Sequence, residues 1–306
     1  MKIIIPISAN DVHSFLRCYP YLMKNFQNSD ILVIGSKAVI DEISFYGLPC
    51  LDEENVLPGL TYNSVYDYIF SLKHGAVKRT GWYYQQFLKM AFALCCEDEY
   101  YMVWDADTIP LKSLTFFDSD NKPFLDYLEN QNADLTYFET LANLMPNNPV
   151  MRVKKLSFVT EHMVFNTKIM RELIYKLSSY GIRKNVDFWK NILLAVNSKK
   201  LGVSGFSEFE TYANYVLNYY PNTYHLRKWN NLRSARSYIG DSPSDRQLAW
   251  IAPYFDVASI EDFCPKIIFS YIVFKFGINM YLYYRILNPI LNVWFRFREF
   301  LRKLIK

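Results

Sequence analysis

The sequence predicts an α/β protein, with a Rossmann-like, doubly wound sheet and a C-terminal basic amphipathic helix. An apolar run at residues 3–7, a helical pattern and a second apolar run at 31–35 together form a βαβ unit. A third apolar run, at residues 100–104, ends abruptly in Asp105-Ala106-Asp107. Basic residues concentrate beyond residue 264. These features favour a parallel sheet followed by a helical tail.

The elements follow in order along the chain. Apolar residues recur at three- and four-residue steps between residues 12 and 23, as in an amphipathic helix. We expect a second helix at 83–95, before the strand at 100–104. Further expected elements are strands at 134–138 and 157–159 and helices at 168–177, 188–195 and 208–217. The composition becomes apolar, aromatic and basic after Cys264-Pro265, which divides the chain into a large domain, 1–264, and a helical tail, 265–306.

Composition and charge exclude several classes of protein. The chain has 306 residues, 51% hydrophobic and 21% charged, which excludes a disordered chain. Residues 265–306 hold eight Lys or Arg and one acid, a charge of +7, whereas the rest carries −3. This asymmetry argues against nucleic acid and favours an anionic membrane surface. Five cysteines without CxxC spacing argue against a disulfide framework or a zinc site. The apolar run at the N-terminus is too short for a signal peptide, so we expect a cytoplasmic protein.

The tail has the pattern of an interfacial membrane helix over residues 288–306. Asn288 can cap the helix and Pro289 suits its first position. One face is apolar and aromatic, and the other is mainly basic; the apolar face holds Leu291, Trp294, Phe297, Leu301 and Leu304. Such a helix lies in the membrane interface, and charged residues upstream interrupt any spanning segment. The alternative is a terminal helix that packs on the protein itself or on a second subunit.

Asp105 and Asp107 form the strongest chemical signal. They follow a predicted central strand, and ligands of open α/β sheets bind beyond the carboxyl ends of strands. Two carboxylates one residue apart can bind Mn²⁺ or Mg²⁺ and leave coordination positions for phosphate oxygens. The alternative is an ordinary acidic turn after a strand.

Three motifs in this order resemble those of small bacterial polysaccharide glycosyltransferases of the GT-A fold, of the DUF6492 type. They are Gly81-Trp82-Tyr83-Tyr84-Gln85-Gln86-Phe87-Leu88-Lys89, Trp104-Asp105-Ala106-Asp107 and Phe206-Ser207-Glu208-Phe209-Glu210. The resemblance implies a GT-A-like catalytic domain over 1–264 that transfers a sugar from a nucleotide-diphosphate donor, a UDP-sugar, with Mn²⁺ or Mg²⁺. It also implies a glycan or glycolipid acceptor. With the basic tail, this favours a lipid-linked cell-surface polysaccharide or oligosaccharide, extended at the inner face of the cell membrane.

The resemblance also implies roles in donor binding. Asp107 would bind the metal, and Asp105 would hold the donor's ribose or bind the metal through water. Lys89 would reach the diphosphate or hold Asp105 in place. After the first strand, the backbone of Ile7 and Ser8 and the carboxylate of Asp11 would contact the base and ribose. Asp11 could equally be the N-cap of the following helix.

The remaining predicted residues concern the acceptor, the base and the leaving group. An inverting transfer needs a carboxylate base, for which Glu208 is the first choice, with Glu210 and Glu161 as alternatives. Glu208 and Glu210 could instead be first-turn acids of a helix capped by Ser207. We expect His162 and Gln86 in acceptor binding, His225 as a further metal ligand, and Arg233 and Arg236 at the leaving diphosphate. A solvated loop explains the two arginines equally well.

A competing chemistry uses the same acids. Asp105-Ala106-Asp107-Thr108 matches the nucleophile motif of haloacid-dehalogenase-like phosphohydrolases, and Gly240-Asp241 with Asp245 matches their late metal motif. Against this, a complete βαβ unit precedes Asp105, whereas that family usually begins its core with the nucleophile strand. A third possibility is a non-catalytic peripheral membrane module in which the acids only solvate a turn.

Overall fold

The computed structural model describes residues 1–26, 30–129, 135–147, 149–153, 155–261 and 290. Two compact units divide the chain: residues 1–106 with 115–229, and residues 107–114 with the chain from 230 onward. The predicted boundary at 264/265 and the tail helix at 288–306 lie outside the described residues, apart from Ile290. Within the described part of the chain, no helix is both long enough and apolar enough to cross a membrane.

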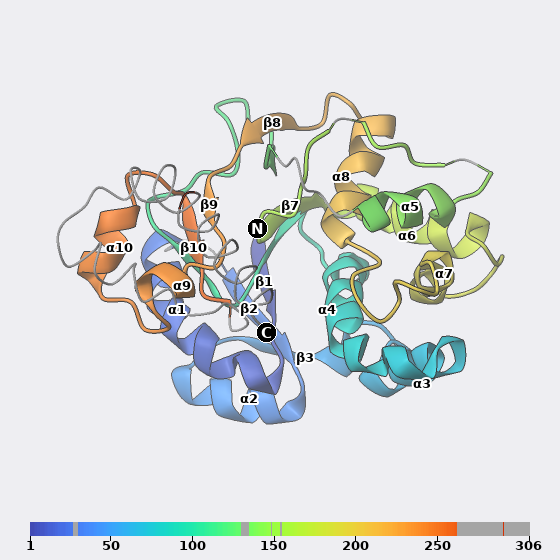
Figure 1. Cartoon of the computed structure of the whole chain (residues 1–306), viewed down its shortest axis with the longest axis horizontal. Helices are drawn as coiled ribbons and strands as arrows, with labels where there is room; N and C mark the ends of the chain where they lie inside the picture. The colour runs from blue at the N-terminus through green and yellow to red at the C-terminus, as the bar shows by residue number, and fades with distance from the viewer. Residues whose placement is uncertain (27–29, 130–134, 148, 154, 262–289, 291–306) are drawn as a thin grey trace, which may run out of the picture. The chain divides into compact units, whose positions relative to one another are not determined.

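The first unit is built on a five-stranded sheet with the order β3-β2-β1-β4-β7. β1 pairs in parallel with β2 and β4, β2 pairs in parallel with β3, and β7 runs antiparallel to β4. Ile3, Ile4 and Ile5 of β1 are all fully buried, as expected for a parallel strand covered on both faces. This confirms the predicted α/β class. The strands are β1 Lys2–Pro6, β2 Asp30–Gly35, β3 Cys50–Asp52, β4 Tyr100–Trp104 and β7 His162–Asn166 (Figure 1).

The strand order contains a topological switch point between β1 and β4, where the chain changes the side of β1 on which it adds strands. From β1 the chain adds β2 and then β3 on one side, and it afterwards returns to place β4 on the other side of β1. The carboxyl ends of β1 and β4 are therefore neighbours, while the connections that follow them lead in opposite directions. Open α/β sheets bind ligands at such a point. The fold thus brings the segments after Pro6 and Trp104 to the place where a site is expected.

Helices and a small second sheet complete the first unit. α3, α4, α6, α7 and α8 share one hydrophobic core with residues of β1, β2, β4 and β7. The helices predicted at 12–23, 83–95, 168–177, 188–195 and 208–217 are confirmed. The α-helices are α1 Val12–Asn25, α2 Lys37–Ile43, α3 Tyr62–Leu72, α4 Thr80–Ala91, α5 Leu135–Leu144, α6 Thr167–Tyr180, α7 Phe188–Ala195 and α8 Glu208–Tyr219. The 3-10 helices are η1 Ala9–Asp11, η2 Ser44–Tyr46, η3 Glu53–Asn55, η4 His74–Arg79 and η5 Phe92–Leu94; β6 Phe124–Tyr127 pairs in parallel with β8 His225–Lys228.

Two predicted strands are wrong. The segment at 134–138 lies largely in helix α5, whose buried residues Thr136, Thr140, Leu141 and Leu144 share one face and pack towards α7 and α8. Its threonine and aromatic residues favour a strand locally, but tertiary packing decides for a helix. The strand predicted at 157–159 begins later, at His162; Ser157 makes only an isolated bridge with Leu128.

The second unit has its own small sheet. β10 (Val257–Ser259) pairs antiparallel with β5 (Thr108–Pro110) and parallel with β9 (Asn231–Leu232). The buried hydroxyls of Thr108 and Ser259 lie 3.0 Å apart and join β5 to β10 by a side-chain hydrogen bond. Two short helices, α9 (Arg236–Ile239) and α10 (Asp245–Ile251), connect β9 to β10.

Asn191 fixes the connection between α6 and α7, and its removal should be costly. Its fully buried amide donates to the carbonyls of Leu177 (2.7 Å) and Arg183 (2.9 Å) and accepts from the Arg183 amide (2.9 Å). We expect Asn191→Ala to lower the free energy of unfolding by about 3 kcal/mol, because buried backbone groups lose their partners. The exposed Asn197, whose side chain accepts one local hydrogen bond, gives the control Asn197→Ala. Urea unfolding checks the difference, and equal midpoints for the two variants would contradict this role.

Candidate functional site

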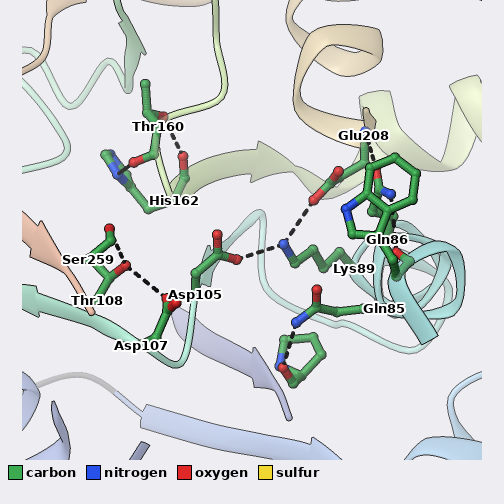
Figure 2. Close-up of polar contacts among 12 residues, drawn as sticks. Gln85, Gln86, Lys89, Asp105, Asp107, Thr108, Thr160, His162, Glu208 and Ser259 are labelled. Carbon is green, nitrogen blue, oxygen red and sulfur yellow. Dashed lines mark hydrogen bonds and ion pairs between the residues drawn. The ribbon is translucent and has the colours of Figure 1, made fainter. Parts of the chain in front are cut away.

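The centre of the site is a buried lysine held between two carboxylates. The Lys89 ammonium donates to Asp105 Oδ1 at 2.8 Å and pairs with Glu208 Oε1 at 2.9 Å (Figure 2). It also lies 4.7 Å from the ring centroid of Phe209, a cation–π contact. We refer to Lys89, Asp105 and Glu208 as the Lys89 cluster. The contact with Asp105 is the one that the second expected role of Lys89, holding Asp105 in place, requires.

Helix α4 brings the parts of this cluster together. Gln85 donates to the carbonyl of Pro6 at the end of β1 (3.1 Å), and Gln86 accepts from the backbone amide of Glu208 at the start of α8 (3.2 Å). The Tyr101 hydroxyl of β4 donates to the carbonyl of Lys89 (2.8 Å). Gln86, which was expected to bind an acceptor, is buried, and its side-chain oxygen already accepts a hydrogen bond from the start of α8. Gln85 belongs to the same motif but was not among the predicted site residues.

The electrostatics of the Lys89 cluster leave one uncompensated negative charge. Burial favours the neutral form of Lys89, but Asp105 and Glu208 raise its pKa above the ordinary value. Burial raises the pKa of Glu208, and the nearby Lys89 offsets only part of that shift. The Asp105 side chain is 31% exposed, against 4% for Lys89 and 5% for Glu208. Asp105 is thus the member of the cluster that a ligand can reach.

The backbone of Glu161 also holds Asp105. The amide of Asp105 donates to the Glu161 carbonyl at 2.9 Å. Glu161 has φ of 64°, in the left-handed region that residues other than glycine rarely adopt. Local strain of this kind persists only where the surrounding structure fixes it. Glu161, one of the predicted bases, therefore contributes to the site through its carbonyl oxygen, while its side chain is buried.

A pocket of about 410 Å³ opens beyond the end of β1, and we refer to it as the β1 pocket. It contains the predicted donor-binding residues Ile7, Ser8 and Asp11. Asp11 occupies the N-cap position of α1, but its side chain makes no capping hydrogen bond; instead, it accepts from the Ser8 hydroxyl at 2.6 Å. The full lining is Pro6, Ile7, Ser8, Ala9, Asp11, Ser36, Glu53, Tyr62, Gly81, Trp82, Tyr84, Gln85 and Leu88.

Three lining residues of this pocket, Glu53, Tyr62 and Tyr84, were not among the predicted site residues. Glu53 follows β3, Tyr62 begins α3 and Tyr84 lies on α4. Tyr84 belongs to the motif around Lys89, but no local pattern marks Glu53 or Tyr62, and the three helices that carry these residues meet only in the folded chain. The one available signal was the position of Glu53 after a short third strand, since the carboxyl ends of parallel strands lie at one edge of the sheet.

Glu210 and Ser207 have structural partners at the start of α8. Glu210 Oε1 accepts from the Ser157 hydroxyl (2.8 Å) and from the amide of Phe158 (3.0 Å). Ser207 is the N-cap of α8 and accepts from the Glu210 amide (3.2 Å). Burial raises the pKa of Glu210, although the hydrogen bonds from Ser157 and Phe158 lower it in part. Of the two acids of this helix start, only Glu208 contacts Lys89 in the described structure.

His162 belongs to a buried ionic network. Its Nε2 lies 2.9 Å from Asp126 Oδ2 and its Nδ1 lies 2.9 Å from the Thr160 carbonyl. Arg227 donates to both oxygens of Asp126, at 2.6 and 2.8 Å. Both ring nitrogens of His162 therefore face acceptors, and the side chain is buried. In this structure His162 braces β7 against β6, and an acceptor sugar would have to compete for its nitrogens.

The remaining predicted residues lie in other pairs. His225 Nδ1 pairs with Asp118 Oδ2 at 2.7 Å in the first unit. In the second unit, Arg233 pairs with Glu261 (3.1 Å) and Arg236 with Asp241 (3.5 Å). Asp107, also in this unit, accepts from the Thr108 hydroxyl at 3.4 Å. Among the described residues, no three His, Cys, Asp or Glu side chains form a group that could hold a metal.

The Asp126 network predicts a specific dependence of stability on pH. Burial favours the neutral acid, but hydrogen bonds from Arg227 and His162 bring the pKa of Asp126 below its ordinary value. The stabilisation is therefore present at neutral pH and is lost as acid protonates Asp126 below pH ~4. We expect Asp126→Asn to cost about 3–5 kcal/mol at pH 7 and less at lower pH.

Urea unfolding of the wild type and the variant at pH 7 and pH 3.5 measures this difference. Glu129→Gln is the control, because Glu129 forms an exposed pair with Lys228 and should cost less than about 1 kcal/mol. A cost of Asp126→Asn that is the same at both pH values would contradict the assignment.

Comparisons with known proteins give a family and a set of distant structures. No curated protein matches the chain in sequence. The structure of mouse xyloside xylosyltransferase 1 in its apo form is 10% identical with a TM-score of 0.43, over 86% of this chain and 98% of that one. The bifunctional glycosyltransferase WbbM is 12% identical with a TM-score of 0.37, over 86% of this chain and 46% of that one. The galactosyltransferase LgtC, in complex with donor and acceptor sugar analogues, is 10% identical with a TM-score of 0.35, over 85% and 86%.

The family match covers most of the first unit and all three residues of the Lys89 cluster. The model of a family of unknown function, DUF6492, matches residues 15–248, a range that contains Lys89, Asp105, Asp107 and Glu208. This confirms the DUF6492 type that the order of motifs in the sequence indicated. The chain belongs to the DUF6492 family.

Proposed function

We propose that this protein is a metal-dependent glycosyltransferase with a GT-A-like catalytic domain, which transfers a sugar from a nucleotide-diphosphate donor. The observation that carries the proposal is the Lys89 cluster, which holds Asp105 at the carboxyl end of β4 with one oxygen fixed and the side chain partly exposed. The motif order that resembles polysaccharide glycosyltransferases supports it, and that resemblance points to UDP as the nucleotide.

The donor would lie at the switch point of the sheet. Its nucleoside would occupy the β1 pocket, which the predicted residues Ile7, Ser8 and Asp11 line. Asp107, with Asp105 directly or through water, would hold Mn²⁺ or Mg²⁺. Carboxylate oxygens suit these cations, and the uncompensated charge of the Lys89 cluster favours a cation nearby. The bound metal would supply charge stabilisation for the departing diphosphate.

The chain's own residues then orient the reaction. Lys89 fixes the rotamer of Asp105, and Glu208 in turn fixes Lys89. Glu208 stays the first choice as base because burial raises its pKa towards the range in which a carboxylate takes a proton from a hydroxyl group. To act in this way, Glu208 has to give up its contact with Lys89 when the acceptor binds. If it keeps that contact, it is a positioning residue.

The sequence of the tail supports the proposed acceptor and the proposed cellular location. A basic amphipathic helix at 288–306 would bring the enzyme to the anionic inner face of the cell membrane, where it would extend a lipid-linked cell-surface polysaccharide or oligosaccharide. This part of the proposal rests on the sequence pattern and on the resemblance.

Calorimetric titration of UDP, with and without Mn²⁺, is the direct test of the donor site. We expect binding that depends on Mn²⁺ and is weakened at least about a hundredfold in Asp107→Ala, because the cation loses a carboxylate ligand. Asp245→Asn is the control, since Asp245 lies in the first turn of α10 and is outside the proposed donor site.

Each result of this titration has a definite meaning. Absence of UDP binding by folded wild-type protein would reject the proposal. Hydrolysis of phosphate esters that is lost in both Asp105→Asn and Asp245→Asn would instead favour the phosphohydrolase alternative.

Glu208→Gln tests the electrostatic part of the site. The glutamine can still accept a hydrogen bond from Lys89, but the charge of the cluster changes from −1 to 0. We expect the affinity for UDP in the presence of Mn²⁺ to fall about tenfold, which corresponds to ~1.4 kcal/mol. A pH profile of sugar transfer separates the two roles of Glu208: loss of the acidic limb identifies a base, and an unchanged profile identifies a positioning residue. Unchanged Mn²⁺ dependence and unchanged transfer would together exclude Glu208 from the site.

A further inference from the structure

The β1 pocket contains a buried hydroxyl group without a partner. Tyr84, on α4, is 3% exposed and lines the pocket. Its hydroxyl oxygen is buried and has no hydrogen-bond partner among the described residues. A buried polar group of this kind is destabilising unless something pairs with it. A ligand in the pocket can supply the missing partner.

Glu53 lines the same pocket from η3, after the end of β3. Burial, with the neighbouring charges of Asp52 and Glu54, raises the pKa of Glu53 to about 7. The same acids act on Tyr84. Burial is the main cause that raises the pKa of Tyr84, and the negative charges of Glu53, Glu54 and Asp52 raise it further, in that order. Two lining residues of the pocket, Tyr84 and Glu53, are therefore close enough for the carboxyl of Glu53 to raise the pKa of the Tyr84 hydroxyl. A carboxyl group kept in such an unfavourable environment points to a role in binding.

The charge of the pocket determines which part of a ligand it can accept. Asp11 and Glu53 are the charged side chains among its described lining residues, and none of these residues is basic. A diphosphate would be repelled there. The rest of the wall is aromatic or uncharged, with the Tyr62 ring set edge-on to Tyr84 at 6.1 Å between centroids. A flat, uncharged ring system that carries N–H or O–H donors fits this lining.

We infer that Tyr84 and Glu53 hold the uncharged nucleoside end of the donor through hydrogen bonds, with the phosphates directed out of the β1 pocket. The inference rests on the proposed function for the identity of the donor. The ionised carboxylate of Glu53 accepts a hydrogen bond from the nucleoside, and the Tyr84 hydroxyl pairs with a second polar atom. Protonation of Glu53 removes one acceptor, so nucleoside affinity rises between pH 6 and pH 8. The described titratable groups around Glu53 are Asp52 and Glu54 beside it, Tyr84 on α4, and Asp11 and Tyr62 elsewhere in the pocket lining.

Binding of uridine, UDP and pyrophosphate at pH 8 to full-length wild type, Tyr84→Phe and Glu53→Gln tests the inference. Tyr84→Phe removes only an unpaired hydroxyl, so the fold should be retained. We expect each variant to bind uridine and UDP about tenfold more weakly, by the same factor for both ligands, and to bind pyrophosphate as the wild type does. The affinity of wild type for uridine should fall at pH 6, and that of Glu53→Gln should not change.

The chain offers a matched control for each variant. Tyr83→Phe removes another buried hydroxyl from the same helix, outside the described lining of the pocket. Glu54→Gln removes the exposed acid next to Glu53. Both controls should bind uridine as the wild type does at pH 8, where Glu53 is ionised.

The results separate this inference from the proposed function. Wild-type affinity for uridine in both Tyr84→Phe and Glu53→Gln, or a loss confined to pyrophosphate, overturns the inference and leaves Mn²⁺-dependent UDP binding to be judged by itself. Uridine binding that is weakened in both variants, in a protein that shows no Mn²⁺-dependent UDP binding, supports a nucleoside site and rejects the transferase. Absence of binding of both uridine and UDP to folded wild type overturns both.

Discussion

The buried ammonium of Lys89 is the constraint on which the candidate site depends. A lysine removed from water needs negative partners, and here it has two, Asp105 at the end of β4 and Glu208 at the start of α8. If either carboxylate turns away, the buried ammonium keeps only one negative partner. The same contact therefore fixes the rotamer of Asp105, the start of α8 and the position of α4 over the sheet.

The surrounding structure reinforces this arrangement from several sides. Gln85 and Gln86, adjacent on α4, bond to the end of β1 and to the start of α8. Glu161 adopts a left-handed conformation and accepts a hydrogen bond from the amide of Asp105. The next residue, His162, begins β7 within the network of Asp126 and Arg227. A conformation with local strain is thus held between a buried ion cluster and a buried ionic network, which is how proteins keep functional groups preorganised.

The first unit contains two chemical environments that differ in charge, the β1 pocket and the Lys89 cluster. The β1 pocket is aromatic and acidic, which suits an uncharged nucleoside. One turn beyond Gln85 on α4, Lys89 shares its charge between two carboxylates and leaves a net charge of −1, which suits a divalent cation. A nucleotide-diphosphate donor has this same order of parts, a neutral ring followed by phosphates that need a cation. The agreement links the two sites in a single proposal.

The sequence by itself determined the features that depend on local pattern. The helices at 168–177, 188–195 and 208–217 follow from apolar periodicity near 3.6 residues, which fixes the face that is buried. The strands of the βαβ unit and the strand before Asp105 follow from short continuous apolar runs, which are typical of strands buried on both faces. The motif around Lys89 indicated the family. The sequence did not determine the state of 134–138, which forms a helix because its buried face packs towards α7 and α8. Nor did it reveal Glu53 and Tyr84 as neighbours, since they come from different elements and meet only where the ends of the strands converge. The contact between Lys89 and Glu208 joins residues far apart in the chain, and only tertiary packing could decide it.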